Sequence, residues 1–204
     1  MYDDDDDDDD EKNGEEKKAE SQSPGAELAK ALFKARTVLV FGEIETKLAE
    51  RVVAQLLGFA AISDEPIRVF ICSNGGHVES GDAIHDVVRF IKAPVKMVGT
   101  GWVASAGAHI FLAAKRENRY CLRNTRFLLH QPWGGVGGVA SDISIEAREI
   151  IKMRERLNRI IARETGQPLE KVAKDTDRNY WMSAEEARDY GLVTHVIERM
   201  DELR

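Results

Sequence analysis

The sequence lacks several features that would place it in large classes of protein. It has only two cysteines, Cys72 and Cys121, each in a short apolar run typical of a strand. Two buried thiols fit a reducing compartment better than a disulfide framework. No run of about 20 apolar residues is present, so no membrane-spanning helix is predicted. The acidic N-terminus has no basic start of a signal peptide. We therefore expect a cytoplasmic protein that does not associate with membranes.

Basic residues are outnumbered by acidic ones, 29 against 36, and the formal net charge is −7. Twelve acidic residues and three lysines fall within the first 20 positions, which leaves the remainder near neutral. A nucleic-acid-binding domain would carry a basic stripe, so nucleic acid is not an expected partner. Residues 1–24 have little to bury and repel one another, which predicts a disordered acidic tail. That tail is either a solubilising extension or a segment that gates an entrance or binds a partner.

Motifs for phosphates and metals are missing. The sequence contains no Gly-Lys-Ser/Thr loop, no His-Glu-x-x-His pair and no CxxC pair, so no metal or other cofactor is expected. Glycines gather instead at 73–78, 99–108 and 132–139, each time after a predicted strand. In an open α/β sheet, sites form beyond the carboxyl ends of the strands. These three segments are therefore the candidates for chemistry.

From Gly25 onward, predicted helices and strands alternate. Apolar spacing predicts helices over 26–36, 46–61, 80–92 and 104–114, and continuous apolar runs predict strands over 37–42, 67–73, 95–100 and 126–131. This alternation is typical of βαβ units around a buried, mostly parallel sheet. The length suits one α/β domain over 25–204.

One helix departs from this rhythm. It is predicted over about 141–165, with a capping serine at its start and Gly166 as its stop. Apolar residues recur along it at three- and four-residue steps, and a helix of about 24 residues spans roughly 36 Å. Because that exceeds the core of a small domain, we expect a projecting handle that packs on another subunit. A short helix and a final strand follow it.

Two residues in the glycine-rich regions are candidates for catalysis. Ser105 lies at a predicted strand-to-helix turn among small residues, where a substrate backbone can approach and an oxyanion can meet backbone N–H groups. The surrounding motif is not the Gly-x-Ser-x-Gly elbow, because Val103 occupies the first glycine position. His130 ends a predicted strand, whereas the other histidines are expected on the surface or on helix faces: His77, His85, His109 and His195. A capping serine and a structural histidine remain the alternatives.

Five segments, in this order and at family-like spacing, resemble the proteolytic subunit of the Clp protease (ClpP). They are SNGGHVESGDAIHDVVRFI, GWVASAGAHIFLAA, TRFLLHQPWGG, SDISIEAREIIKMRERLN and DTDRNYWMSAEEARDYGLV. The resemblance runs from about Val38 to Ile197. It implies a crotonase-like α/β spiral of βαβ units, with the helix near 141–165 as the handle that joins two seven-subunit rings into a tetradecamer. It also implies an AAA+ unfoldase as partner.

The resemblance assigns roles to individual residues. Ser105 stands at the position of the nucleophile of a serine endopeptidase, and His130 at that of its general base. Gly76 and Ala106 match the residues whose N–H groups form the oxyanion hole. The sequence departs from the family pattern at Asn74, where a proline is usual, and upstream of Val38.

The third triad position is the largest departure. The family ends its Asp-Thr-Asp/Glu-Arg-Asp motif in an acid, and this sequence has Asn179 there. An amide oxygen still accepts a hydrogen bond from histidine but supplies no charge, and in a trypsin-like enzyme the Asp-to-Asn change lowers kcat roughly 10⁴-fold. Asp175 or Asp177 is the alternative third residue.

Three functions follow as hypotheses. The first is a weakened or conditional serine endopeptidase that cleaves peptides or unfolded proteins inside an oligomeric chamber through Ser105, His130 and Asn179. The second is a non-catalytic subunit in a mixed ring with an active paralogue. The third is an acyl-CoA enzyme, because the crotonase fold serves both chemistries.

Overall fold

The computed structural model describes residues 24–135 and 137–203. Most of the predicted acidic tail, residues 1–23, lies outside them. The chain divides after Thr37 into two compact units. In the first, helix α2 (Pro24–Lys34) begins at a proline and ends at a lysine, as helix preferences favour. Its apolar side chains Leu28 and Phe33 are exposed.

The second unit is built on a seven-stranded sheet with the strand order β1-β2-β3-β4-β7, to which β5 and β6 are added through β3. The strands are β1 (Thr37–Ile44), β2 (Ile67–Gly76), β3 (Val95–Ala104), β4 (Arg119–Leu122), β5 (Arg126–Leu129), β6 (Tyr180–Met182) and β7 (His195–Ile197). The helices are α3 (Thr46–Ile62), α4 (Val78–Phe90), α5 (Ala106–Phe111), α6 (Ala140–Thr165), α7 (Leu169–Asp175) and α8 (Ala184–Tyr190), with short 3₁₀ turns at Arg116–Asn118 and Met200–Glu202.

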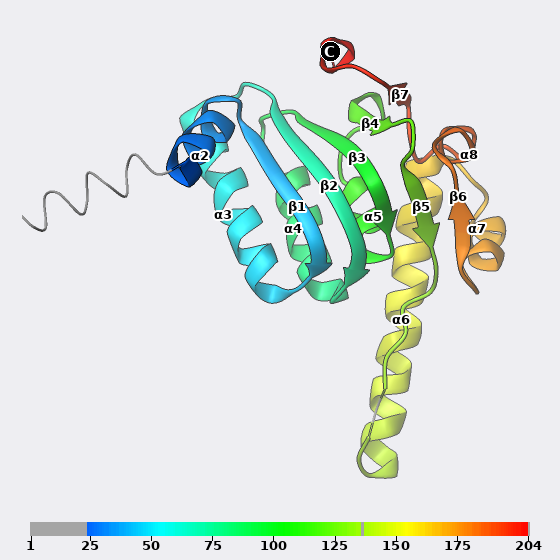
Figure 1. The fold of residues 1–204 in the computed structure, drawn as a ribbon. Coiled ribbons are helices and arrows are strands. Elements are labelled where there is room, and N and C mark those ends of the chain that lie inside the picture. Colours follow the sequence, from blue (N-terminus) through cyan, green and yellow to red (C-terminus); the bar gives the residue numbers. More distant parts are fainter. Residues whose placement is uncertain (1–23, 136, 204) are drawn as a thin grey trace, which may run out of the picture. The chain divides into compact units, whose positions relative to one another are not determined.

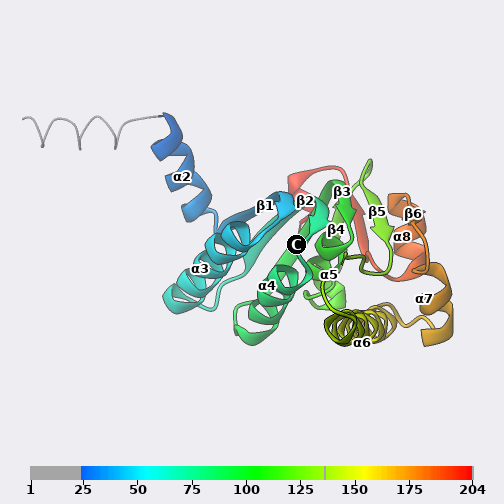
Figure 2. The same ribbon diagram turned by 90° about the horizontal axis from the view of Figure 1, so that it is seen from below.

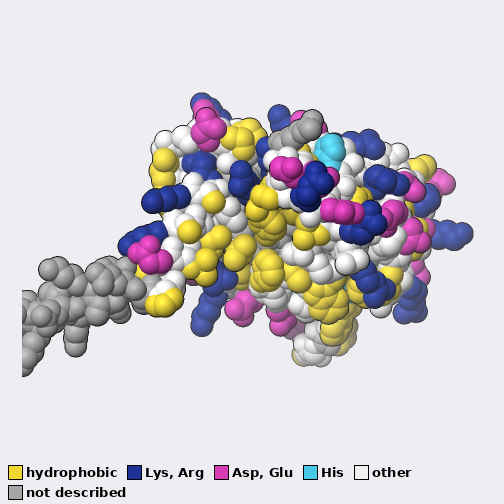
Figure 3. Space-filling view, turned by 45° about the horizontal axis from the view of Figure 1, so that its top comes forward, with side chains coloured by type: hydrophobic (Ala, Val, Ile, Leu, Met, Phe, Trp, Pro, Cys, Tyr) yellow, Lys and Arg dark blue, Asp and Glu magenta, His cyan; other side chains and the backbone are white. Residues whose placement is uncertain are grey.

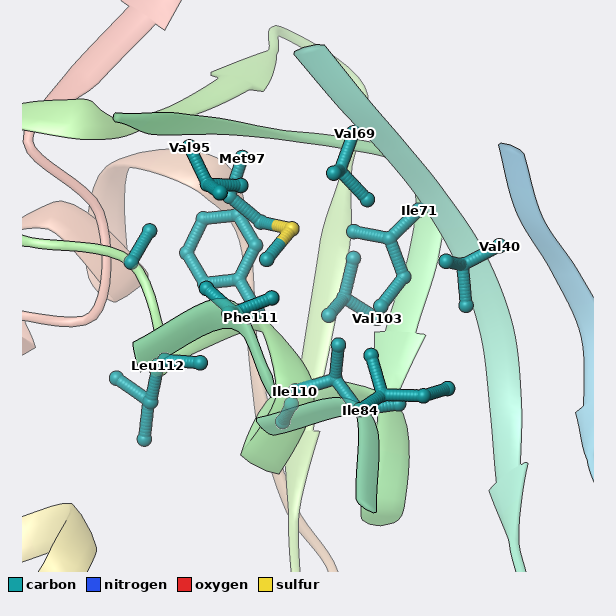
Figure 4. Packing of buried hydrophobic residues seen from close by; sticks show 14 of the residues in the cluster. Val40, Val69, Ile71, Ile84, Val95, Met97, Val103, Ile110, Phe111 and Leu112 are labelled. Carbon is teal, nitrogen blue, oxygen red and sulfur yellow. The ribbon is translucent and has the colours of Figure 1, made fainter. Parts of the chain in front are cut away.

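Helices α3, α4 and α5 lie side by side along one face of the sheet (Figures 1 and 2). The core forms between them because alternate side chains of the strands point to that face. In β2, for example, Ile67, Val69 and Ile71 are fully buried. Figure 4 shows Val69 and Ile71 packed with Ile84 of α4 and other apolar side chains. The predicted alternation of buried strands and amphipathic helices is thus realised.

The opposite side chains of β1 are apolar as well. Leu39 and Phe41 are exposed, whereas their neighbours Val38 and Val40 are buried. Figure 3 shows apolar side chains gathered in the middle of the face seen there, among scattered charged ones. Exposed apolar side chains that gather on one face are typical of surfaces that bind another protein.

Strand β3 pairs with different partners along its length. Its first half, Met97–Gly99, pairs with β4, and its second half, Trp102–Ala104, pairs with β5, all in parallel. The register with β2 shifts between these halves, and Gly101 takes a φ of +59° there. The bend carries the end of β3 onto β5. It therefore sets which residues meet at the carboxyl ends of these two strands.

Helix α6 extends well past the sheet (Figure 1). Of its residues, only Asn158, Ile161 and Thr165 are buried, all in the last two turns. Gly166 ends the helix in the left-handed conformation, with φ +79°. The projecting part exposes the apolar side chains of Ile143 and Ile151.

The α/β prediction with a mostly parallel sheet is confirmed, and the long helix begins one residue earlier than expected. Two features were not predicted. The final segment holds two short helices, α7 and α8, rather than one, and β6 lies between them.

Both cysteines are free, with Cys121 buried and Cys72 half-buried. Within the described residues, no helix is long and apolar enough to cross a membrane.

Candidate active site

Ser105 lies between the end of β3 and the start of α5. Its backbone takes φ +55° and ψ −121°, a conformation that non-glycine residues rarely adopt. Its N–H donates to Leu128 O of β5 at 2.9 Å, which fixes the turn against the neighbouring strand. The side chain is half-buried. A strained serine at a strand-to-helix turn is typical of a nucleophile presented at the edge of a sheet.

Glycine is required where β2 ends beside this serine. A Cβ on Gly75 would lie 2.6 Å from Ser105 Cβ, and a Cβ on Gly76 would lie 2.3 Å from Ile44 O. Both residues also have positive φ, +96° and +145°. The backbone of Gly75 therefore passes directly against the serine, and that of Gly76 passes against Ile44 at the end of β1. Ala106, which begins α5, has its N–H in the first turn, where no carbonyl within the helix accepts from it.

His130 and Asn179 meet because of strand register. Strands β5 and β6 are antiparallel, with Leu129 opposite Tyr180, so the next residue of one faces the preceding residue of the other. His130 Nδ1 lies 3.1 Å from Asn179 Oδ1. With its proton on Nδ1, the imidazole donates to the amide oxygen and leaves Nε2 as a free base.

The two aspartates that precede Asn179 bind elsewhere. Asp175 accepts hydrogen bonds from Lys171 at 2.6 Å and from the Tyr190 hydroxyl at 2.9 Å. Asp177 Oδ1 accepts hydrogen bonds from Arg154 at 3.1 Å and from Gln131 Nε2 at 3.3 Å. Neither has a described contact with His130, so the structure pairs this histidine with Asn179 alone.

Ser105 and His130 line one cavity, together with side chains of α5 and α6. Within the described part of the chain, neither Ser105 Oγ nor His130 Nε2 makes a hydrogen bond. Next to the cavity, a wider cleft of about 650 Å³ runs past His130, Asn179 and the exposed ring of Trp133. The structure thus brings Ser105, His130 and Asn179 to one place, with Gly76 and Ala106 at the ends of the segments that flank the serine.

A buried polar network beside Ser105 was missed by sequence reasoning. His109 was expected on the surface or on a helix face. It lies on α5 but is buried, and its Nε2 is 2.8 Å from Asp82 Oδ1. Its ring stacks on His85, also buried, with centroids 4.3 Å apart. Arg156 of α6 binds both oxygens of Asp82, at 2.7 and 2.6 Å. The only available signal was that His109 lies one helical turn beyond Ser105.

The charge of Asp82 is held by this network. Burial by itself raises the pKa of its carboxyl, but the hydrogen bonds from His109 and Arg156 outweigh burial and hold the pKa well below its usual range. Across the described residues, no group of three or more His, Cys, Asp or Glu side chains is placed to hold a metal ion.

Comparison with known proteins gives one consistent family. The family model for Clp protease matches residues 20–200. The chain is 64% identical over 173 residues to ATP-dependent Clp protease proteolytic subunit 3 of Rhizobium etli, covering 85% of this chain and 89% of that one. It is also 64% identical to proteolytic subunit 2 of Gluconobacter oxydans, over 89% of this chain and 82% of that one.

Solved structures agree with these relatives. ClpP1 from Listeria monocytogenes has a TM-score of 0.79 and 56% sequence identity, covering 87% of this chain and 99% of its own. An asparagine-to-aspartate mutant of the same protein has a TM-score of 0.82 at the same identity and coverage.

Proposed function

Because this chain belongs to the Clp protease family, a family of serine endopeptidases, we propose that it hydrolyses peptide bonds with Ser105 as nucleophile, His130 as general base and Asn179 as the residue that orients His130. One observation carries this assignment. His130 Nδ1 contacts Asn179 Oδ1 at 3.1 Å, and the same histidine shares a cavity with Ser105.

The reaction follows from these positions. Ser105 Oγ attacks the carbonyl carbon of the scissile bond, and its proton passes to Nε2 of His130. The carbonyl oxygen, now negative, accepts hydrogen bonds from the N–H groups of Gly76 and Ala106. The C–N bond breaks as His130 returns the proton to the leaving amine. Water, deprotonated by His130, then hydrolyses the acyl-serine ester.

Asn179 limits the rate in this scheme. Its oxygen holds the tautomer of His130 in which Nε2 is free, but the amide does not stabilise the imidazolium that forms when the serine loses its proton. In a trypsin-like enzyme, the absence of that charge lowers kcat roughly 10⁴-fold, which is about 5 kcal/mol of activation free energy. The chain is therefore a weakened or conditional peptidase.

The assembly belongs to the proposal too. Clp proteolytic subunits generally form oligomeric rings that work with AAA+ partners. We infer that α6 is the handle between two heptameric rings, since its projecting part exposes Ile143, Ile145 and Ile151 to solvent. Peptides or unfolded proteins delivered by an AAA+ unfoldase are then cleaved inside the chamber.

A second candidate is a non-catalytic subunit that completes a mixed ring with an active paralogue. Asn179 favours it, since the catalytic charge is missing here. Relatives of the chain are also named as numbered subunits, proteolytic subunit 3 in Rhizobium etli and proteolytic subunit 2 in Gluconobacter oxydans.

Labelling with a fluorophosphonate probe tests the proposed nucleophile. We expect covalent labelling at Ser105, read by mass spectrometry of the peptide that carries it, and its loss in Ser105→Ala. Ser144→Ala, on the exposed part of α6, is the matched control and keeps the label. Absence of Ser105 labelling in the assembled protein would overturn the peptidase assignment and leave the non-catalytic ring subunit.

A further inference from the structure

The first turn of α5 holds Ser105 in place. The backbone N–H of His109 donates to Ser105 O at 3.1 Å, which closes this turn on the serine. Ser105 itself has a strained backbone conformation, with φ +55°. Such a conformation persists only where the surrounding structure fixes it. A group that fixes His109 therefore also fixes the turn that presents Ser105.

Helix α4 fixes this turn from the side. The Asp82 carboxylate accepts a hydrogen bond from Nε2 of His109 at 2.8 Å. His85, one turn further along α4, stacks on the same imidazole ring, with centroids 4.3 Å apart. Gly81 lies so close to α5 that a Cβ on it would be 3.4 Å from the Cβ of Ala106. Helix α4 thus contacts α5 at its first residue and again about one turn later.

Helix α6 in turn fixes Asp82. The guanidinium of Arg156 donates to both carboxylate oxygens of Asp82, at 2.7 and 2.6 Å. A two-point contact of this kind fixes orientation as well as distance. In the part of the chain that the structure describes, the side chain of Arg156 makes no other hydrogen bond or ion pair, and 45% of it is exposed. Arg156 therefore acts on the rest of the protein through Asp82.

We propose that Arg156 and Asp82 are positioning residues for the nucleophile. Their ion pair joins α6 to α4 and fixes His109, and the turn that His109 closes presents Ser105. Neither charged residue has to touch the substrate. The inference rests on the proposed function, because it concerns the reactivity of Ser105. A reacting group displaced by about 1 Å loses up to roughly 100-fold in rate, so a small movement of this turn is enough to be measured.

Arg156→Ala tests the ion pair. We expect the rate constant for labelling of Ser105 by a small fluorophosphonate to fall about 10- to 100-fold. The kcat for a short peptide falls with it while KM changes little, because no group that binds substrate is removed. Arg159→Ala is the matched control, since Arg159 lies on the same helix but pairs with the exposed Glu155, at 3.2 Å. The control keeps the wild-type rate, and oligomer size is measured on every sample. A similar fall in both variants would contradict the role given to Arg156.

Chemical rescue separates positioning from a general loss of folding. Because Arg156 is half-exposed, the space that alanine leaves is open to small cations. Methylguanidinium brings a planar pair of donors back to Asp82, and we expect it to restore most of the labelling rate in Arg156→Ala. Slow labelling that methylguanidinium does not restore would contradict the positioning role. The double variant Asp82→Asn/Arg156→Ala has no carboxylate for the cation, so rescue that persists there would contradict it as well.

The wild type separates this inference from the proposed function. If the small fluorophosphonate fails to label Ser105 in the assembled wild type, the proposed function is wrong and this inference falls with it. If it labels Ser105 at the same rate in the wild type and in Arg156→Ala, the positioning role alone is wrong.

Discussion

His85 and His109 stack on each other in the interior, His109 one helical turn beyond Ser105, and burial decides the protonation state of His85. Burial is the main cause that lowers the pKa of His85 from 6.5 to about 4, and the adjacent ring of His109 adds to this effect. The titratable groups around the pair are Asp82, Asp86, Arg89 and Arg156. His85 is therefore neutral in the folded chain at every pH where the protein is expected to work.

This lowered pKa predicts a pH dependence of stability. The folded state binds this proton less readily than the unfolded state. The contribution of His85 to the free energy of unfolding is therefore complete above pH 6.5 and is lost as the pH drops from 6.5 towards 4. We expect a loss of about 2 kcal/mol between pH 7 and pH 5 from this residue. Urea unfolding at both pH values measures it, and His85→Phe keeps the ring stack as the control. An equal loss in that variant would contradict the assignment to His85.

At the scale of elements, Arg119 joins three parts of the fold. It begins β4 and is fully buried. Its guanidinium donates to the carbonyl oxygens of Leu112 and Ala114 at the end of α5, and to the carbonyl of Glu164 near the end of α6. It also pairs with the Glu164 carboxylate. The base of the projecting helix is therefore fixed to the helix that begins at Ser105.

Replacing Arg119 is expected to be severe. Arg119→Met leaves three carbonyl groups without their donor and Glu164 without its buried partner, which costs about 3 kcal/mol or more of the free energy of unfolding. Urea unfolding measures the loss. Arg116→Met, at an exposed position three residues earlier, is the matched control and changes little. Similar losses in both variants would refute the role given to Arg119.

The elements also show how far sequence reasoning reaches. The buried strands, α3 and α6 follow from local apolar spacing, because burial repeats with the period of each element. Strand β6 has only three residues and gives no such pattern. The branch of β3 onto β4 and β5 is a long-range pairing that no local signal encodes. The residues of the site were expected from the family resemblance, and their meeting depends on the register of β5 and β6. The polar network around His109 required the packed structure.

At the scale of the whole molecule, the projecting part of α6 needs a partner. None of its residues before Asn158 is buried in the described chain, although Ile143, Ile145 and Ile151 are apolar. A helix with an uncovered apolar stripe is stabilised by packing on another surface. A second copy of the chain is the partner that the proposed double ring supplies.

Charged residues on this stripe are expected to weaken assembly. The double variant Ile143→Asp/Ile151→Asp places two acids in the proposed interface and should sediment as a smaller species than the wild type. Lys47→Asp, on the exposed face of α3, adds an acid elsewhere and serves as control. Sedimentation velocity measures the size of the assembly formed by each of the two variants. An unchanged sedimentation coefficient in the double variant would place the interface away from this part of α6.

Peptidase kinetics of the wild type beside Asn179→Asp, with oligomer size measured on the same samples, tests the central claim most directly. The substitution restores the charge beside His130 and leaves Ser105 and the backbone donors unchanged. We predict that kcat for a short fluorogenic peptide rises about 10- to 1,000-fold, because the missing charge is one part of the triad's contribution. An unchanged rate with an intact assembly would contradict the pairing of Asn179 with a catalytic His130 and would favour the non-catalytic ring subunit.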